Sequence, residues 1–332
     1  MHNCPVSTPG TDTLVTRLRA AGCVFAEDED ELLLSAATDP GHLESLVVQR
    51  IAGYPLEHLL GWAEFRGLRV AVAPDVFVPR QRTAFLVDQA IDLGRNKIRE
   101  TTTRSALVAL DMCCGCGALG LAFATELAAE GIHVDLTASD IEPAAIECAR
   151  RNLAPVGAQV LEGDLFDPIP TDLAGRVDIL LANTPYVPTT EIAWMPPEAR
   201  DHEPRAALDG GPDGLDILRR IAAVATHWLA PGGHLLVEES EQQAPLAAEV
   251  MRRHGLEPRI AEDDDLGATV VIGTRPTARL PPQPPDSRPR PTRTAPWATA
   301  HGAHRRNPHR DSPTHACRPS SIHSRGAARS LR

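Results

Sequence analysis

The chain has 332 residues, 42% of them hydrophobic, which is enough apolar material for the core of one large domain or two smaller ones. Its formal net charge of −11 is unevenly distributed: residues 276–332 hold eleven arginines against two aspartates, a balance of +9, which leaves −20 for residues 1–275. Because nucleic-acid binding draws on cationic side chains, so acidic a body argues against a general nucleic-acid-binding protein. No stretch is long and apolar enough to span a bilayer, and no signal-peptide pattern opens the chain, so we expect a cytoplasmic protein.

Residues 1–60 are predicted to form a small helical domain. Apolar side chains recur at helical intervals over three stretches, residues 13–21, 28–37 and 43–52. The acidic run Glu27–Glu31 suits the first turn of the second helix, where the helix dipole favours negative charge. We expect this run to be a solvated helix start rather than a binding site.

Residues 61–100 are predicted to connect this domain to a sheet. The alternation of Phe65–Val72 across Gly67 indicates a β-hairpin, and a helix follows over Thr83–Leu93. Arg80 and Arg82 stand just before this helix. Because surface arginines seldom bind ligands, we expect both to lie outside any functional site.

From Ala106 to residue 275, strands and helices alternate, which predicts an α/β fold with a doubly wound, mostly parallel sheet. The strands are expected over residues 106–111, 133–139, 159–162, 177–182, 234–238 and 268–273. Helices are expected over residues 143–152, 214–228 and 244–254, with a turn at Gly232-Gly233. The proline- and arginine-rich residues 276–332 hold few apolar side chains and are predicted to be disordered.

The segment Asp111–Gly117 joins the first of these strands to helix-like Ala118–Leu121. Small residues at a strand-to-helix turn let the backbone approach a nucleotide, and Asp111 at the strand end can take a polar group of the ligand. The spacing is not the dinucleotide fingerprint, so the pattern gains weight only from the residues that end the later strands.

Further polar residues close the next strands. Asp140 ends the second strand, where a carboxylate can accept both hydroxyls of a ribose; it can also cap the following helix, and the two roles are compatible. Asp164 and Leu165 follow the third strand and suit an adenine, whose exocyclic amine donates to a carboxylate while its ring packs on an apolar side chain. Carboxyl ends of parallel strands meet at one edge, so we expect these residues to share a pocket.

Asn183-Thr184-Pro185-Tyr186 ends the fourth strand and suits methyl transfer to a planar nitrogen. Such a nitrogen is a poor nucleophile, and two acceptors, the Asn183 side-chain oxygen and the Thr184 backbone carbonyl, can hold both of its hydrogens and orient it. Pro185 stiffens the turn, and Tyr186 can stack on the planar group. The alternative is an ordinary Asn-Pro turn.

The seven cysteines are odd in number and cluster in the Cys113–Cys116 turn, which does not resemble a secreted disulfide framework. No second Cys/His pair follows at zinc-finger spacing, so we expect small residues lining a loop and no metal site.

Together, Asp111–Gly117, Asp140, Gly163-Asp164-Leu165 and Asn183–Tyr186, preceded by Tyr54–Gly61 and Val78-Pro79-Arg80, resemble the HemK/PrmC family of S-adenosylmethionine-dependent methyltransferases. The resemblance spans residues 11–275 and implies a Rossmann-like class I methyltransferase fold. Members methylate the side-chain amide of the glutamine in the Gly-Gly-Gln motif of peptide chain release factors.

The resemblance also implies roles for individual residues. The cofactor, S-adenosyl-L-methionine, would be bound by Asp111, Cys113, Cys114, Gly115, Cys116, Gly117, Asp140, Ile141, Asp164, Leu165 and Asn183. The glutamine would be held by Asn183, Thr184, Pro185 and Tyr186. The N-terminal helices would meet the release factor, and the irregular segment after Tyr186 would cover the pocket as a lid.

Three segments depart from the family pattern. Asn183-Thr184-Pro185-Tyr186 stands for Asn-Pro-Pro-Tyr, Cys113–Gly117 for a loop with an additional first glycine, and Pro79–Ala84 for Pro-Arg-Pro-Glu-Thr-Glu, with a reversed charge. The chain can therefore be a divergent paralogue. Two other functions stay open, namely an N-methyltransferase acting on base amines of RNA or DNA and a cofactor-binding protein without turnover.

Overall fold

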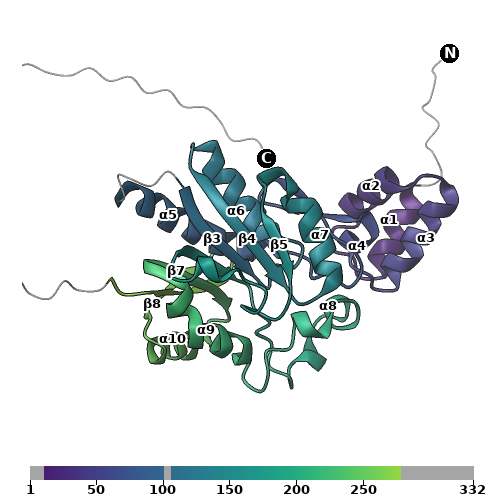
Figure 1. Cartoon of the computed structure of the whole chain (residues 1–332). Coiled ribbons are helices and arrows are strands. Elements are labelled where there is room, and N and C mark those ends of the chain that lie inside the picture. Colours follow the sequence, from purple (N-terminus) through teal and green to yellow (C-terminus); the bar gives the residue numbers. More distant parts are fainter. Residues whose placement is uncertain (1–10, 101–105, 278–332) are drawn as a thin grey trace, which may run out of the picture. The chain divides into compact units, whose positions relative to one another are not determined.

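A computed structural model of the chain describes residues 11–100 and 106–277 (Figure 1). The chain divides into two units, residues 1–279 and 280–332, and every described residue belongs to the first. The predictions for the tail therefore lie outside the described residues. Within the described part, no helix is long and apolar enough to cross a membrane.

The N-terminal helices have a small apolar core of their own. They are α1 (Thr11–Ala20), α2 (Ala26–Ala36), α3 (Pro40–Ile51) and α4 (Leu56–Leu60). Leu18, Leu33 and Val47 are fully buried between them. The predicted helices are confirmed, whereas the existence of a separate domain over residues 1–60 stays a prediction.

The acidic start of α2 corrects one expectation. Glu29 and Asp30 are buried rather than solvated, and Arg50 of α3 donates to both carboxylate oxygens of Glu29, at 2.7 and 3.0 Å. Arg50 also donates to Glu198 at 3.0 Å. The helix dipole explains why acidic residues stand at the start of α2, but it does not reveal that Glu29 is the ion-pair partner of Arg50.

The predicted hairpin is confirmed as β1 (Trp62–Phe65) paired antiparallel with β2 (Leu68–Ala71). Arg66 and Gly67 both have positive φ, 52° and 72°, as a two-residue hairpin turn requires. After the short turn of 3-10 helix Gln81–Thr83, α5 (Ala84–Glu100) runs longer than predicted.

A seven-stranded sheet of order β5-β4-β3-β6-β7-β9-β8 forms the centre of the fold. Its strands are β3 (Ala106–Met112), β4 (His133–Asp140), β5 (Gln159–Glu162), β6 (Val177–Ala182), β7 (Leu229–Glu239), β8 (Glu257–Asp263) and β9 (Ala268–Thr274). The ladders among the first five are parallel, and β9 pairs antiparallel with both β7 and β8. The doubly wound, mostly parallel sheet is confirmed.

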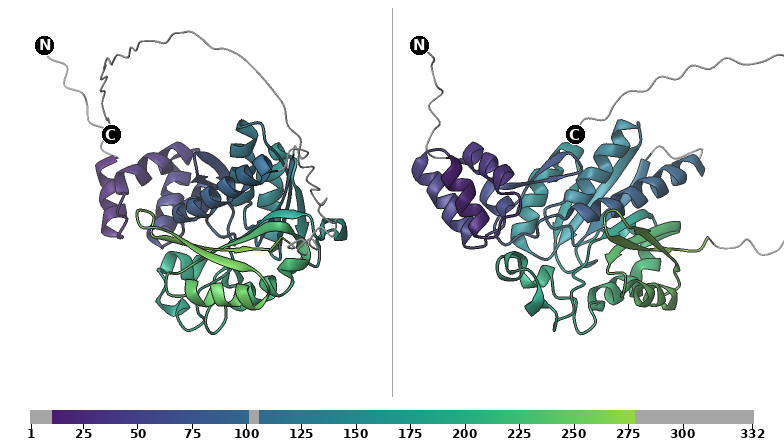
Figure 2. Two further views of the ribbon diagram at one scale, coloured as in Figure 1. Left: turned by 90° about the vertical axis from the view of Figure 1, so that its left-hand side faces the viewer. Right: turned by 180° about the vertical axis from the view of Figure 1, so that it is seen from behind.

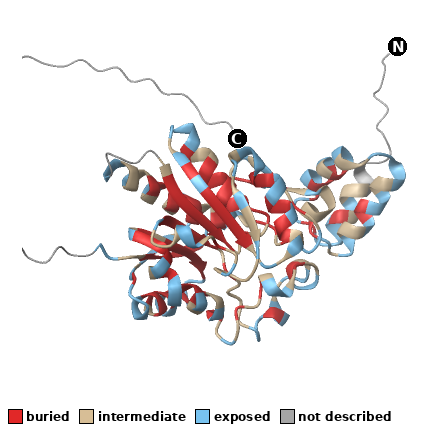
Figure 3. Cartoon of the chain, in the orientation of Figure 1, coloured by how far each residue is buried: buried red, intermediate tan, exposed pale blue. Residues whose placement is uncertain are grey.

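Helices cover both faces of this sheet. Apolar residues of α5, α6 (Ala118–Ala129) and α7 (Pro143–Leu153) join one core cluster, and those of α9 (Asp216–Trp228) and α10 (Ala244–Arg253) join the other. Figures 1 and 2 show these two groups on opposite sides of the strands. Because both faces are covered, β3 and β6 are almost entirely buried (Figure 3), as their continuous apolar sequences require.

Two local predictions were wrong. The Gly232-Gly233 turn lies inside β7, where the register to β6 shifts between the Val177 and Ile179 pairs. β8 was not predicted, because four of its seven residues are exposed and it lacks an apolar run. The remaining short helix, α8 (Pro197–His202), belongs to the irregular segment after Tyr186.

Candidate active site

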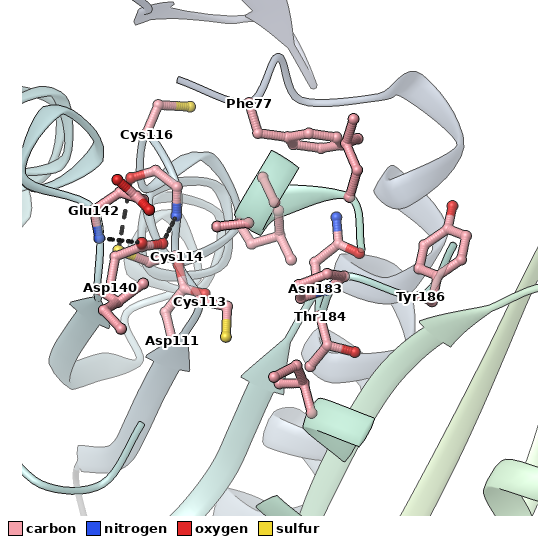
Figure 4. A pocket seen from close by; sticks show the side chains of 18 of the residues that line it. Phe77, Asp111, Cys113, Cys114, Cys116, Asp140, Glu142, Asn183, Thr184 and Tyr186 are labelled. Carbon is pink, nitrogen blue, oxygen red and sulfur yellow. Dashed lines mark hydrogen bonds between the residues drawn. The ribbon is translucent and has the colours of Figure 1, made fainter. Parts of the chain in front are cut away.

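One cavity of about 390 Å³ lies where β3, β4, β5 and β6 end (Figure 4). β3 lies between β4 and β6, so the chain order reverses there, and open α/β sheets bind ligands at the carboxyl edge of such a point. All predicted site residues except Gly117 line this cavity: Asp111, Cys113, Cys114, Gly115, Cys116, Asp140, Ile141, Asp164, Leu165, Asn183, Thr184, Pro185 and Tyr186. Gly117 does not line it and is the residue that precedes α6, packed against Leu153.

The turn after β3 is fixed by hydrogen bonds to β4. The backbone N–H of Cys114 donates to the Ser139 carbonyl at 3.0 Å, and that of Gly115 donates to Asp140 Oδ2 at 2.8 Å. Cys113 has a φ of 55°, a left-handed conformation that glycine adopts without cost and other residues adopt rarely. The first cysteine of this loop therefore occupies a position suited to glycine.

The loop thiols are protonated at neutral pH. Burial raises the pKa of Cys113 and of Cys114, and raises that of Cys116 to about 12. Thiolates are what bind metals and attack electrophiles, so these side chains act as small packing groups. Over residues 11–100 and 106–277, no group of three or more metal-binding side chains could hold a metal ion.

Asp140 presents its carboxylate to the cavity while supporting the turns on either side of it. Besides the bond from Gly115, its Oδ1 accepts the backbone N–H of Glu142 at 3.0 Å. Glu142, not Asp140, is the capping residue of α7. Each carboxylate oxygen has capacity for a further donor, so these bonds leave Asp140 able to accept hydroxyl groups of a ligand.

Asp111 is 1% exposed and serves the helix that follows it. Its Oδ2 accepts the backbone N–H of Gly120 in α6 at 2.9 Å. Burial, together with the nearby Asp140 carboxylate, raises the pKa of Asp111 to about 7, although the bond from Gly120 opposes this shift. A Cβ on residue 120 would stand 2.8 Å from Asp111 Oδ2, so a glycine is needed there.

The turn after β5 carries the next two predicted residues. Arg220 donates to Asp164 at 2.6 Å, and the Asp164 side chain is 41% exposed. Leu165 has a φ of 48°, an uncommon conformation for a large side chain, and it lines the cavity. Acceptance of an adenine amine by Asp164 stays a prediction, since Arg220 is its observed partner.

Asn183 follows directly on β6 and presents an unsatisfied acceptor. Its Oδ1 is shielded from solvent and has no hydrogen-bond partner. Figure 4 shows its amide across the cavity from Asp140, beside Tyr186. A buried acceptor without a donor costs about 1–3 kcal/mol, so this oxygen is free to accept an N–H or O–H group when the Asn183 side chain turns it toward the cavity. Thr184 is 2% exposed, and its hydroxyl also lacks a partner.

The expectation that Arg80 and Arg82 lie outside the site was wrong, because both line the cavity. Arg80 donates to Glu203 at 2.6 Å, and Arg82 donates to Glu238 at 2.9 Å. Arg82 also contacts the Tyr186 hydroxyl. Nearby buried carboxylates thus hold both guanidinium groups at the cavity wall.

Comparisons with known proteins agree with this geometry. Residues 81–195 match the family model of the methyltransferase small domain. The release factor glutamine methyltransferase of Geobacter sulfurreducens is 36% identical over 232 residues, which are 69% of this chain and 76% of the relative. The chain belongs to the release factor glutamine methyltransferase family.

Two further proteins are similar to this chain. A 4-amino-L-phenylalanine/4-methylamino-L-phenylalanine methyltransferase of Streptomyces pristinaespiralis is 34% identical, over 72% of this chain and 80% of the relative. The solved structure of a release factor-specific protein-(glutamine-N5) methyltransferase from Alicyclobacillus acidocaldarius has a TM-score of 0.35 at 24% identity, covering 62% of this chain and 98% of that one.

As a member of the release factor glutamine methyltransferase family, the protein is an S-adenosyl-L-methionine-dependent enzyme. The cavity fits such a nucleoside cofactor by two observations. Asp140 keeps acceptor capacity for ribose hydroxyls, and the apolar Ile141 side chain, 56% exposed at the cavity, offers a surface to an adenine ring. The turn at Gly115 leaves open space around its backbone.

The remaining cavity walls come from segments to which we assigned no site residue. Phe77 stands before α5, and Met195 and Ala206–Asp209 belong to the irregular segment after Tyr186. The expected lid therefore does line the cavity. Glu203 fixes it there, because its carboxylate also accepts the Val78 backbone N–H at 3.2 Å. The sequence signal for this wall was the long run without helix or strand periodicity.

Proposed function

We propose that this protein transfers a methyl group from S-adenosyl-L-methionine to the side-chain amide nitrogen of a glutamine, in the Gly-Gly-Gln motif of a peptide chain release factor. The observation that carries the proposal is Asn183, which lines the cavity and whose Oδ1 is an acceptor without a donor. The side-chain amide of a glutamine substrate has two N–H groups, and one of them can donate to Asn183 Oδ1. The names of the family's relatives support the choice of acceptor.

The chemistry asks the protein for orientation rather than for a strong base. The cofactor supplies an electrophilic methyl group on a sulfonium. Asn183 Oδ1 and the Thr184 carbonyl would take the two amide hydrogens, which fixes the nitrogen and favours the charge that develops on it. Pro185 restricts the turn that carries both acceptors, and the Tyr186 ring would pack on the planar amide.

The same proposal assigns the other side of the cavity to the cofactor. Asp140 would accept the ribose hydroxyls, Ile141 and Leu165 would pack on the adenine, and the backbone of Cys113–Gly117 would approach the rest of the molecule. The N-terminal helices α1–α4 would contact the release factor. Since that substrate belongs to translation, the protein would act in the cytoplasm.

The test incubates the purified chain with S-adenosyl-L-methionine and a release factor, and maps the modified peptide by mass spectrometry. We expect one added methyl group on the glutamine of the Gly-Gly-Gln motif and none when that glutamine is replaced. Parallel reactions contain RNA, DNA or 4-aminophenylalanine. Transfer to one of these and not to the release factor refutes the proposal, and cofactor binding without any transfer indicates a binding protein.

Replacement of Asn183 by alanine tests the acceptor atom itself. We expect cofactor affinity, measured by calorimetry, to stay within about threefold, while turnover falls by about 100-fold or more, because a positioned hydrogen-bonding group contributes that much to a transition state. Asn96→Ala on the exposed face of α5 is the matched control and keeps full turnover. Unchanged turnover in Asn183→Ala removes Asn183 from the mechanism.

A further inference from the structure

The Tyr186 hydroxyl is held from two sides at the cavity wall. It donates to Glu238 Oε1 at 3.1 Å, and the Arg82 guanidinium contacts the same hydroxyl while its Nε donates to the same carboxylate oxygen at 2.9 Å. The three groups come from different parts of the chain: the turn before α5, the loop after β6, and β7. Each of them contacts both of the others.

Burying the Glu238 carboxylate in this network costs desolvation free energy, which favours a role for the network beyond packing. The Glu238 side chain is 3% exposed and its second oxygen has no partner, so its charge depends on Arg82. Arg82 in turn is 46% exposed and lines the cavity with Tyr186, while Glu238 stands behind them. A buried carboxylate thus anchors two residues at the cavity wall, and a ligand in the cavity would meet both.

The backbone of this loop leaves the Tyr186 ring in need of an anchor. Thr184 precedes Pro185, and a Thr-Pro step keeps a rotatable φ that a Pro-Pro step does not have. A stacking ring orients an amide only if the ring is held in place, and two side chains that bind its hydroxyl hold the outer end of the Tyr186 ring.

Building on the proposed function, we propose that Arg82 and Glu238 are positioning residues that lock the Tyr186 ring beside Asn183, so that the acceptor amide is held at the angle that methyl transfer requires. The phenol is neutral, because burial, followed by the Glu238 charge, raises the pKa of Tyr186 to about 12 against the opposing effect of Arg82. Tyr186 therefore acts through its ring and its fixed position, not as a phenolate base.

The network can be tested without turnover. The chain has only two tyrosines, Tyr54 and Tyr186, so labelling tyrosine with ¹³C at Cζ gives two NMR signals that Tyr54→Phe assigns. We expect Arg82→Leu and Glu238→Gln to shift the Tyr186 signal, since Cζ reports hydrogen bonding of its hydroxyl. Arg95→Leu, which breaks an ion pair between α5 and Glu130, should not shift it. An unmoved Tyr186 signal in both network variants overturns the proposal.

Kinetics with the acceptor protein then tests positioning. Arg82→Leu and Tyr186→Phe should each lower kcat by about tenfold while the Kd of S-adenosyl-L-methionine changes less than about twofold, because only the acceptor loses its orientation. The double variant should be no slower than either single variant, and Arg82→Lys should recover part of kcat.

The outcomes separate the two proposals. The positioning role is refuted if the kcat losses of Arg82→Leu and Tyr186→Phe multiply in the double variant. It is also refuted if the variants lose only cofactor affinity. Neither result contradicts the release factor as substrate. A wild-type chain that methylates no release factor refutes the proposed function, and the NMR signals still decide whether Arg82 and Glu238 hold Tyr186.

Discussion

Glu239 at the end of β7 makes the stability of this protein depend on pH. Its side chain is 3% exposed, and neither carboxylate oxygen has a hydrogen-bond partner. Burial, followed by the charges of Glu238 and Asp213, raises the pKa of Glu239 from 4.5 to about 8. We predict that Glu239→Gln removes a destabilising charge and stabilises the protein at alkaline pH.

The sign and size follow from the two pKa values. Between pH 4.5 and pH 8 the folded protein keeps the Glu239 proton and the unfolded chain releases it, so the free energy of unfolding falls as the pH rises. At about 1.4 kcal/mol for each pKa unit, the loss reaches about 3 kcal/mol at pH 7 and about 5 kcal/mol above pH 9 as an upper limit. Glutamine has the same shape without the charge, so the variant should not show this loss.

The assay is urea denaturation at pH 5, 7 and 9, with wild type and variant compared at each pH so that the other titrating groups cancel. We expect similar stabilities at pH 5 and a gain for Glu239→Gln that widens toward pH 9. Glu262→Gln, on the exposed face of β8, controls for the loss of a negative charge. Parallel stability curves for wild type and Glu239→Gln would refute the reasoning.

Three further substitutions test other features of the structure. Arg50→Leu leaves the buried Glu29 carboxylate without its cation, so we expect the free energy of unfolding to fall by about 3 kcal/mol in urea denaturation; a loss within error contradicts this. Cys113→Gly relieves a left-handed conformation and should raise stability by about 1 kcal/mol in thermal unfolding, whereas a lower melting temperature would show that the thiol packs usefully. Gly120→Ala pushes a methyl group against Asp111, and we expect at least about tenfold weaker binding of S-adenosyl-L-methionine by calorimetry; unchanged binding would show that the turn adapts.

The strands of the parallel sheet were the most predictable part of the fold. The predicted bounds of β6 coincide with those in the structure, because a buried parallel strand has a short apolar sequence between turn residues. Those of β5, an edge strand without a buried residue, coincide as well, since Val160 and Leu161 stand between turn residues. β8 escaped prediction for the opposite reason. It is an edge strand whose hydrogen bonds to β9 hold it, and exposed positions such as Arg259 leave no apolar signature.

The site residues also differ in how far the sequence predicts them. Residues that end a strand, such as Asp140 and Asn183, could be placed at one edge from topology alone. Arg80 and Arg82 could not, since the carboxylates that hold them are 123 and 156 residues away in sequence. A surface arginine and a cavity arginine look identical until the fold brings their partners to them.

The cavity walls come from separate groups of loops. The edge that we propose for the methyl donor is built by the loops after β3, β4 and β5, whereas the opposite edge is built by the loop after β6, the segment that reaches Asp209 and the turn before α5 that carries Arg82. We expect exchanges in this second group of loops to alter which planar amine is accepted while the cofactor keeps the ribose and adenine contacts proposed above.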